Sequence, residues 1–176
     1  MNSVPKKVSN KIAQNRMNKC ISNLNNISTI CKNPSSLLLA IAEQGKELAK
    51  EQLGIYGIDK NGELGTSIQA NLVSKNIAEL SADGGHAVFV EYGAGIVGKR
   101  HPHELAKQHG VEYNTGSQIQ HFNDKDKDFW TYFNDKDGMF YKTHGQRSKP
   151  FMLRAVKKLS RKVPSIVKSK IKEISK

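Results

Sequence analysis

Apolar residues recur at helical spacing in the first third of the chain. Over residues 8–31 this spacing predicts a helix, with apolar residues at Ile12, Met17, Ile21, Leu24 and Ile27. A second helix is predicted over residues 37–53, after the break at Pro34. Gly54 is expected to end it, because glycine readily takes the left-handed conformation found at many helix C-termini. Two i,i+3 ion pairs are expected on its solvent side, Glu43–Lys46 and Glu47–Lys50.

The helical pattern returns at the C-terminus. A last helix is predicted to begin at Pro150, a residue that suits the first helical position. Its apolar seam runs through Met152, Val156, Leu159 and Val163, and continues through Ile166, Val167, Ile171 and Ile174. Phe151 and Met152 are expected to anchor the helix to the core. Pro164 falls inside the pattern and is expected to kink or split the helix.

Shorter patterns predict two pairs of strands. Residues 66–73 alternate weakly between apolar and polar, and residues 77–81 follow as a second strand. Residues 129–133 and 139–143 are aromatic strands, and the step Asp137-Gly138 between them is typical of a hairpin turn. The sequence therefore predicts an α+β fold with N-terminal helices, a small mixed or antiparallel sheet with a long loop, and a C-terminal helix.

Two central segments are less regular. Residues 87–92 are apolar and β-branched, and their pattern fits either a buried strand or a short buried helix. Residues 93 to about 128 are rich in glycine, histidine and charge, and are expected to form a long loop that is either functional or disordered.

Composition adds a strong charge asymmetry to this picture. The chain has 176 residues, 37% of them hydrophobic, and a net charge of +12. Residues 1–33 hold six basic and no acidic residues, whereas residues 145–176 hold eleven basic residues and one acidic residue. The middle of the chain is slightly acidic, with eleven basic and fifteen acidic residues. Basic ends around an acidic middle indicate either a polyanionic partner, nucleic acid first, or lysine-rich helix faces that are simply solvated.

The sequence shows no signal for membrane insertion, secretion or disulfide formation. No apolar run approaches 18 residues and no signal-peptide pattern is present, so we expect no membrane contact and synthesis in the cytoplasm. Cys20 and Cys31 would lie about 16 Å apart along one helix, too far for a disulfide, and are expected to be reduced.

The sequence lacks the residue spacing that common catalytic, metal-binding and cofactor-binding motifs require. The histidines, which include His101, His103, His109 and His144, lack the HExxH or paired Cys/His spacing of a zinc site. There is no GxSxG nucleophile motif. Residues 93–98 read GAGIVG, but the charged run after them is no crossover helix, as a dinucleotide site requires. We therefore expect no catalytic, cofactor-binding or metal-binding residues, and a protein that is not an enzyme.

Two longer motifs carry a resemblance to a known family. Residues 90–98 read VEYGAGIVG and are followed by HPH at 101–103; residues 138–152 read GMFYKTHGQRSKPFM. In this order and spacing they resemble the tail-completion, or minor neck, proteins of long-tailed bacteriophages. The resemblance covers roughly residues 37–160. It departs from the family pattern at Ala94, where threonine is usual, and at Glu104, where a second proline is usual.

The resemblance implies a structural virion protein of the phage neck that completes the head-proximal end of the tail. Such subunits form a homo-oligomeric ring, here expected to be a hexamer, through which the genome passes. Expected partners are a tail terminator or tail tube protein, a head-closure or connector protein, and genomic DNA. The resemblance places a candidate assembly loop at Glu91, Tyr92, Gly93, Gly95, Gly98, His101 and His103.

The basic ends lie outside these motifs and divide the chain. We predict a basic N-terminal helical arm (1–33), a tail-completion α+β domain (34–160) and a basic C-terminal helical extension (161–176). Residues expected to face DNA or an acidic partner are Lys157, Lys158, Arg161, Lys162, Lys168, Lys170 and Lys172. The alternatives are a tail terminator-like minor tail protein and a basic phage DNA-binding protein; a nuclease or other hydrolase is the weakest.

Overall fold

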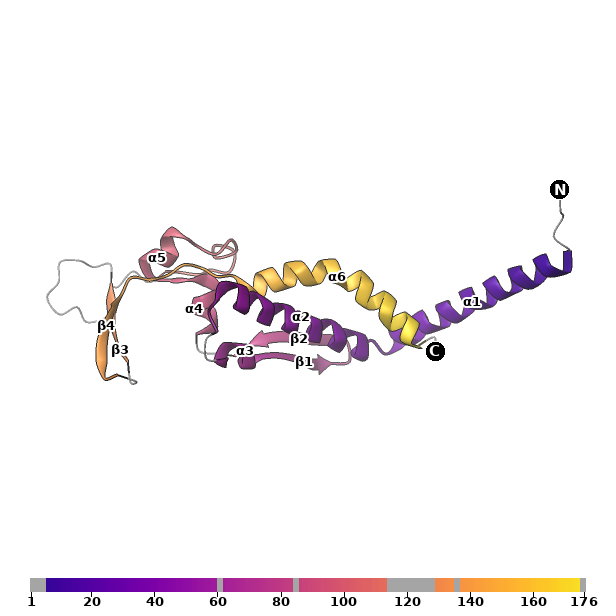
Figure 1. The fold of residues 1–176 in the computed structure, drawn as a ribbon, viewed down its shortest axis with the longest axis horizontal. Helices are drawn as coiled ribbons and strands as arrows, with labels where there is room; N and C mark the ends of the chain where they lie inside the picture. The colour runs from indigo at the N-terminus through magenta and orange to yellow at the C-terminus, as the bar shows by residue number, and fades with distance from the viewer. Residues whose placement is uncertain (1–5, 60–61, 84–85, 114–128, 135–136, 175–176) are drawn as a thin grey trace.

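A computed structural model describes residues 6–59, 62–83, 86–113, 129–134 and 137–174. In chain order the elements are α1 (Lys6–Lys32), α2 (Ser35–Tyr56), α3 (Glu63–Ser67), β1 (Ile68–Ser74), β2 (Ile77–Ala82), α4 (Ala87–Tyr92), α5 (Gly95–Arg100), β3 (Trp130–Asn134), β4 (Met139–Thr143), β5 (Gly145–Gln146) and α6 (Phe151–Ile174). The α+β fold is confirmed. The molecule is elongated, with the β3–β4 hairpin at one end and α1 projecting from the other (Figure 1).

Helix α2 lies at the centre of the fold, between α6 on one side and the β1–β2 hairpin on the other (Figure 1). The largest fully buried side chains of the core are Leu48, Leu53, Ile68 and Phe151. Gly45 makes this close packing possible, since a Cβ there would lie only 3.0 Å from the Leu80 side chain and 3.1 Å from that of Leu159. A larger residue at this position would push the hairpin and α6 away from α2.

The predicted helices are present, with corrected ends. The prediction that Gly54 ends α2 was wrong: the helix continues to Tyr56, and Gly57 takes the left-handed conformation with φ +61°. The Glu43–Lys46 and Glu47–Lys50 ion pairs are confirmed, at 3.9 and 3.5 Å.

Pro164 does not split the last helix. α6 continues through it to Ile174 and bends part-way along its length (Figure 1). The proline is exposed, so water can satisfy the carbonyl that its missing N–H leaves without a helical partner. α6 also crosses the predicted domain boundary at residue 160 without a break, while the division itself stays a prediction.

The N-terminal helix buries little of its apolar face. Met17, Ile21 and Leu24 are 61%, 50% and 65% exposed. Figure 1 shows the reason: most of α1 extends beyond the body of the molecule. Cys20 and Cys31 are both exposed and free, as expected.

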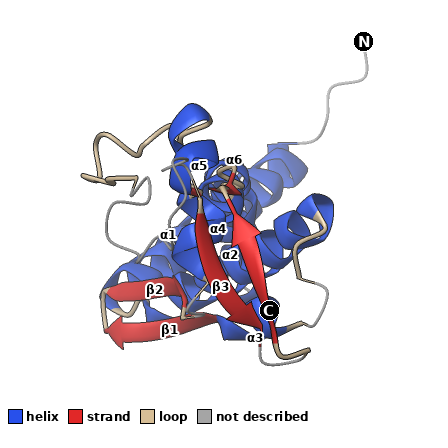
Figure 2. Ribbon diagram, turned by 90° about the vertical axis from the view of Figure 1, so that its left-hand side faces the viewer, coloured by secondary structure: helices blue, strands red, loops and turns tan. Residues whose placement is uncertain are grey.

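The strands form two separate antiparallel hairpins in the described residues. β1 and β2 pair from Ile68–Ala82 to Ser74–Ile77, and β3 and β4 pair from Trp130–Thr143 to Asn134–Met139. Seen from the β3–β4 end, that hairpin stands in front of the helices (Figure 2), and the side view shows it apart from β1–β2 (Figure 1). The predicted first strand began too early, because residues 66–67 belong to α3.

The structure decides the two central segments. Residues 87–92 form the helix α4, one of the two alternatives that the sequence left open. The expected long loop from residue 93 was wrong over residues 95–100, which form α5. Residues 114–128 of that predicted loop lie outside the described residues. In the described part of the chain, no helix is long and apolar enough to cross a membrane.

Candidate functional site

The two motifs meet in space, through residues that lie 50 and 52 positions apart in sequence. Isolated β-bridges join Ala94 to Gln146 and Gly95 to Gly145. Further along, the Lys149 amide donates to the Val90 carbonyl at 2.8 Å. The backbone from α4 into α5 is therefore held against the segment that leads into α6. We call this contact the motif junction, formed by residues 90–103 and 144–153.

Glu91 is the central side chain of the motif junction. Its carboxylate accepts hydrogen bonds from the backbone amides of Met152 (2.9 Å to Oε2) and Leu153 (3.0 Å to Oε1). These amides belong to the first turn of α6, whose N–H groups have no partner within the helix. Pro150, the residue before the helix, has no capping side chain, so Glu91 supplies the N-cap from a distant part of the sequence. Its negative charge also interacts favourably with the helix dipole.

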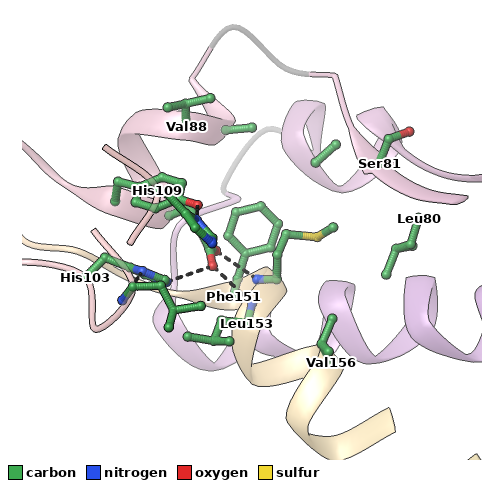
Figure 3. A pocket seen from close by; sticks show the side chains of 14 residues that line it. Leu80, Ser81, Val88, His103, His109, Phe151, Leu153 and Val156 are labelled. Carbon is green, nitrogen blue, oxygen red and sulfur yellow. Dashed lines mark hydrogen bonds and ion pairs between the residues drawn. The ribbon is translucent and has the colours of Figure 1, made fainter. Parts of the chain in front are cut away.

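His103 completes the surroundings of Glu91 (Figure 3). Its Nε2 lies 3.2 Å from Glu91 Oε1, and the His103 side chain is only 1% exposed. Its Nδ1 accepts the Leu105 amide at 3.0 Å. Because Nδ1 is an acceptor, the proton of a neutral imidazole lies on Nε2 and points to Glu91. Both ring nitrogens are therefore engaged, which suits a structural role and leaves neither free to act as a base on a substrate.

Two tyrosines and a second histidine extend the cluster. The Tyr92 hydroxyl lies 2.6 Å from His109 Nδ1, and the Tyr92 ring packs 4.6 Å from the His103 ring between centroids. The Tyr113 hydroxyl donates to the Tyr92 carbonyl at 2.8 Å and accepts the His103 amide at 3.1 Å. Burial, with a smaller contribution from the Glu91 charge, raises the pKa of Tyr92 above its ordinary value.

Glycines allow the backbones of the motif junction to approach each other. Gly93 has φ +84°, and a Cβ there would lie 2.7 Å from the Ser148 nitrogen. Gly145 has φ +93°, and its Cβ would overlap the Ala94 carbonyl oxygen. Only glycine combines such positive φ values with contacts this short. The GAGIVG sequence thus serves backbone packing in the subunit.

An open, largely apolar groove of about 310 Å³ borders the motif junction. Its walls come from β2, α4 and α6, and include Leu80, Val88, Phe151, Met152 and Val156 (Figure 3). Polar side chains also line it: Glu91 and His103 are bonded to each other, the Tyr92 hydroxyl lies 2.6 Å from His109 Nδ1, and Ser81 is the remaining one. The groove therefore presents an apolar surface and no converging reactive groups.

Most of the candidate assembly loop lies inside the subunit. Glu91, Gly93, Gly95, Gly98 and His103 are buried, Tyr92 is half-buried, and His101 is exposed. The buried positions contact segment 144–153 and residues such as Leu105 and Tyr113 of the same chain, and their role in assembly stays a prediction. Sequence reasoning missed Ser148, although this small residue lies within the second motif. Its hydroxyl donates to the Glu91 carbonyl at 2.6 Å. Sequence reasoning also missed Tyr113, which lies outside both motifs.

The candidate basic residues divide into two groups. Three are in ion pairs, namely Lys157–Glu104 (2.6 Å), Lys158–Glu51 (2.8 Å) and Lys170–Glu173 (3.0 Å). The lysine hydrogen bonds lower the pKa values of Glu104 and Glu51 below the ordinary carboxyl value. The second group makes no ion pair with any described residue: Arg161, Lys162, Lys168 and Lys172.

Comparisons with known proteins identify no relative of this chain. No protein-family model, curated protein or solved structure matches this chain. Among the described residues, no group of three or more histidine, cysteine or acidic side chains is placed to hold a metal ion.

Proposed function

We propose that this chain is a structural subunit of a phage neck, which completes the head-proximal end of the tail and helps to join it to the head connector. The observation that carries the proposal is the motif junction. The two segments that resemble tail-completion proteins fold together around Glu91, with contacts to residues 61 and 62 positions away. A chance resemblance in two unrelated segments gives no reason for them to form one packed unit.

The shape of the subunit supports a role in assembly. Exposed apolar side chains occur along the elongated molecule and include both of its ends, α1 and the β3–β4 hairpin, where Met139 and Phe140 are 59% and 74% exposed. Apolar surface of this kind is typical of regions that contact other proteins. Contacts between two different surfaces of one subunit generate a ring when the rotation closes. The proposal includes such a homo-oligomeric ring, a hexamer, in the virion, with a tail terminator or tail tube protein and a head-closure protein as neighbours.

The site supports a non-enzymatic role better than a hydrolase. In the buried Glu91–His103 pair of the motif junction, Glu91 caps the start of α6, and both His103 nitrogens are occupied, one by Glu91 and the other by the Leu105 amide. A basic phage DNA-binding protein is the second candidate, and the exposed cations of α6 favour it. A tail terminator-like minor tail protein differs from the first proposal only in its neighbours.

Electron microscopy of phage particles tests the proposal. In lysates of phage that lack this gene, we expect filled heads beside separate tails, and complementation in trans should restore joined particles. Normally joined particles from the deletion mutant would refute the neck assignment and favour the DNA-binding alternative. Heads without packaged DNA would place the defect at an earlier step and would also contradict the proposal.

A further inference from the structure

The outward face of α6 carries a regular row of cations. Arg154, Arg161, Lys168 and Lys172 are all exposed and recur at intervals of seven, seven and four residues, which places them on one helix face. None of the four makes an ion pair with a described residue. We call these four residues the basic stripe. At 1.5 Å per residue it spans about 27 Å.

Three of the neighbouring lysines of α6 are held in ion pairs. Lys157 and Lys158 flank the stripe but pair with Glu104 and Glu51 of the body. Lys170 lies on the opposite face, where it is half-buried and pairs with Glu173. The structure thus separates lysines that hold α6 to the body from cations that face solvent, a distinction that charge counting along the sequence cannot make.

We propose that the basic stripe binds the phosphate backbone of duplex DNA without reading its sequence. Duplex DNA carries about one charge per 1.7 Å of axis, so about 27 Å of helix passes roughly 16 phosphates. Cations that are not already held in ion pairs are the groups that backbone binding needs, since their contacts release counterions. The biological setting rests on the proposed function, in which the genome passes through the ring.

Other partners fit this face less well. Protein interfaces are centred on apolar and aromatic side chains, and between Arg154 and Lys172 the stripe offers only charged residues and the small Ser165. A membrane-bound amphipathic helix inserts its apolar face. The apolar face of α6 begins with the fully buried Phe151 and Ala155, which pack in the core of the subunit.

Salt-dependent binding to a labelled duplex of about 30 base pairs, at about 50 to 200 mM salt, tests the proposal with the full chain. The stripe variant carries Arg154→Gln, Arg161→Gln, Lys168→Gln and Lys172→Gln. Glutamine has nearly the helix propensity of lysine and arginine, so α6 should persist, which circular dichroism can check. The control variant loses the same charge at four exposed positions outside α6: Lys75→Gln, Lys99→Gln, Arg100→Gln and Lys107→Gln.

For four lost phosphate contacts, we expect the slope of log K against log salt to become shallower by about 3 to 4 in the stripe variant. The control variant should change it by less than about 1. No binding of wild-type protein at the lowest salt, or an equal change in both variants, would overturn the proposal. Equally tight binding of poly-glutamate or anionic lipid vesicles would also overturn it, because the surface would then not favour nucleic acid. None of these outcomes affects the micrographs that test the neck assignment.

Discussion

Glu91→Gln tests whether a buried carboxylate stabilises the start of α6. The wild-type carboxylate accepts three N–H groups, from Met152, Leu153 and His103, and Glu91 is only 7% exposed. A glutamine side chain keeps the size but has one acceptor oxygen, and its NH₂ group must face at least one of these donors. In the less costly orientation, the amide nitrogen faces Met152, so one helix N–H and the new NH₂ both lose their partners.

The cost follows from these contacts. Each buried donor left without a partner costs about 1–3 kcal/mol. Loss of a helix N-cap costs about 0.5–2 kcal/mol and overlaps with that figure, since it counts one of the same amides. We therefore expect Glu91→Gln to lower the free energy of unfolding by about 2–4 kcal/mol. The middle of that range corresponds to roughly a hundredfold rise in the unfolded fraction.

Urea unfolding followed by circular dichroism measures this loss. The midpoint should fall while the denaturant slope stays unchanged, because the surface exposed on unfolding is the same. Glu47→Gln is the matched control: Glu47 is exposed, pairs with Lys50 at 3.5 Å, and its replacement should change stability by less than about 0.5 kcal/mol. Hydrogen exchange at the Met152 and Leu153 amides should accelerate in Glu91→Gln alone. Equal stability of the two variants would show that the N-cap does not stabilise the fold.

Two further predictions concern the backbone and the surface. Gly145→Ala should destabilise the protein severely, because the alanine Cβ would overlap the Ala94 carbonyl. Gly110→Ala is the control: Gly110 has φ +65° and open space around it, so the substitution should cost only about 1–2 kcal/mol in a thermal melt. Equal costs would mean that the backbones at Gly145 and Ala94 do not approach closely. Lys157→Met should raise the pKa of Glu104 towards its ordinary value in an NMR titration of the carboxyl group. Because the pKa of Glu104 is lowered in the folded protein, any contribution of this pair to stability is present above the ordinary carboxyl pKa and is lost as pH falls through the lowered value. An unchanged titration would contradict the ion pair.

Local patterns in the sequence were sufficient for most elements. The helical spacing of apolar residues predicted α1, α2 and α6, and the alternation and turn residues predicted both hairpins. These signals are local, since each depends on residues within one or two turns of a helix or one hairpin. Predictions failed where local signals competed, as at Gly54, which resembles a helix end but lies one turn before the glycine that takes the left-handed conformation, Gly57.

The charge asymmetry was also visible in the sequence, but the sequence did not show which of the lysines form ion pairs within the subunit. Lys157 and Lys158 look identical to Lys168 and Lys172 along the chain. The fold places Glu104 and Glu51 beside the first two, 53 and 107 residues away in sequence. Similarly, apolar spacing predicted that α1 is a helix but not that its apolar face is exposed, because burial depends on which elements pack there.

The sequence by itself determined the three long helices, the two hairpins, the basic ends and the two motifs at the centre of the functional proposal. Only the tertiary structure decided what the motif residues do. Glu91 and its partners on α6 lie more than sixty residues apart, and the contact between them exists because glycines let two backbone segments approach to hydrogen-bonding distance. Contacts over such separations depend on the global packing of α2, α6 and the hairpins, so no local pattern encodes them.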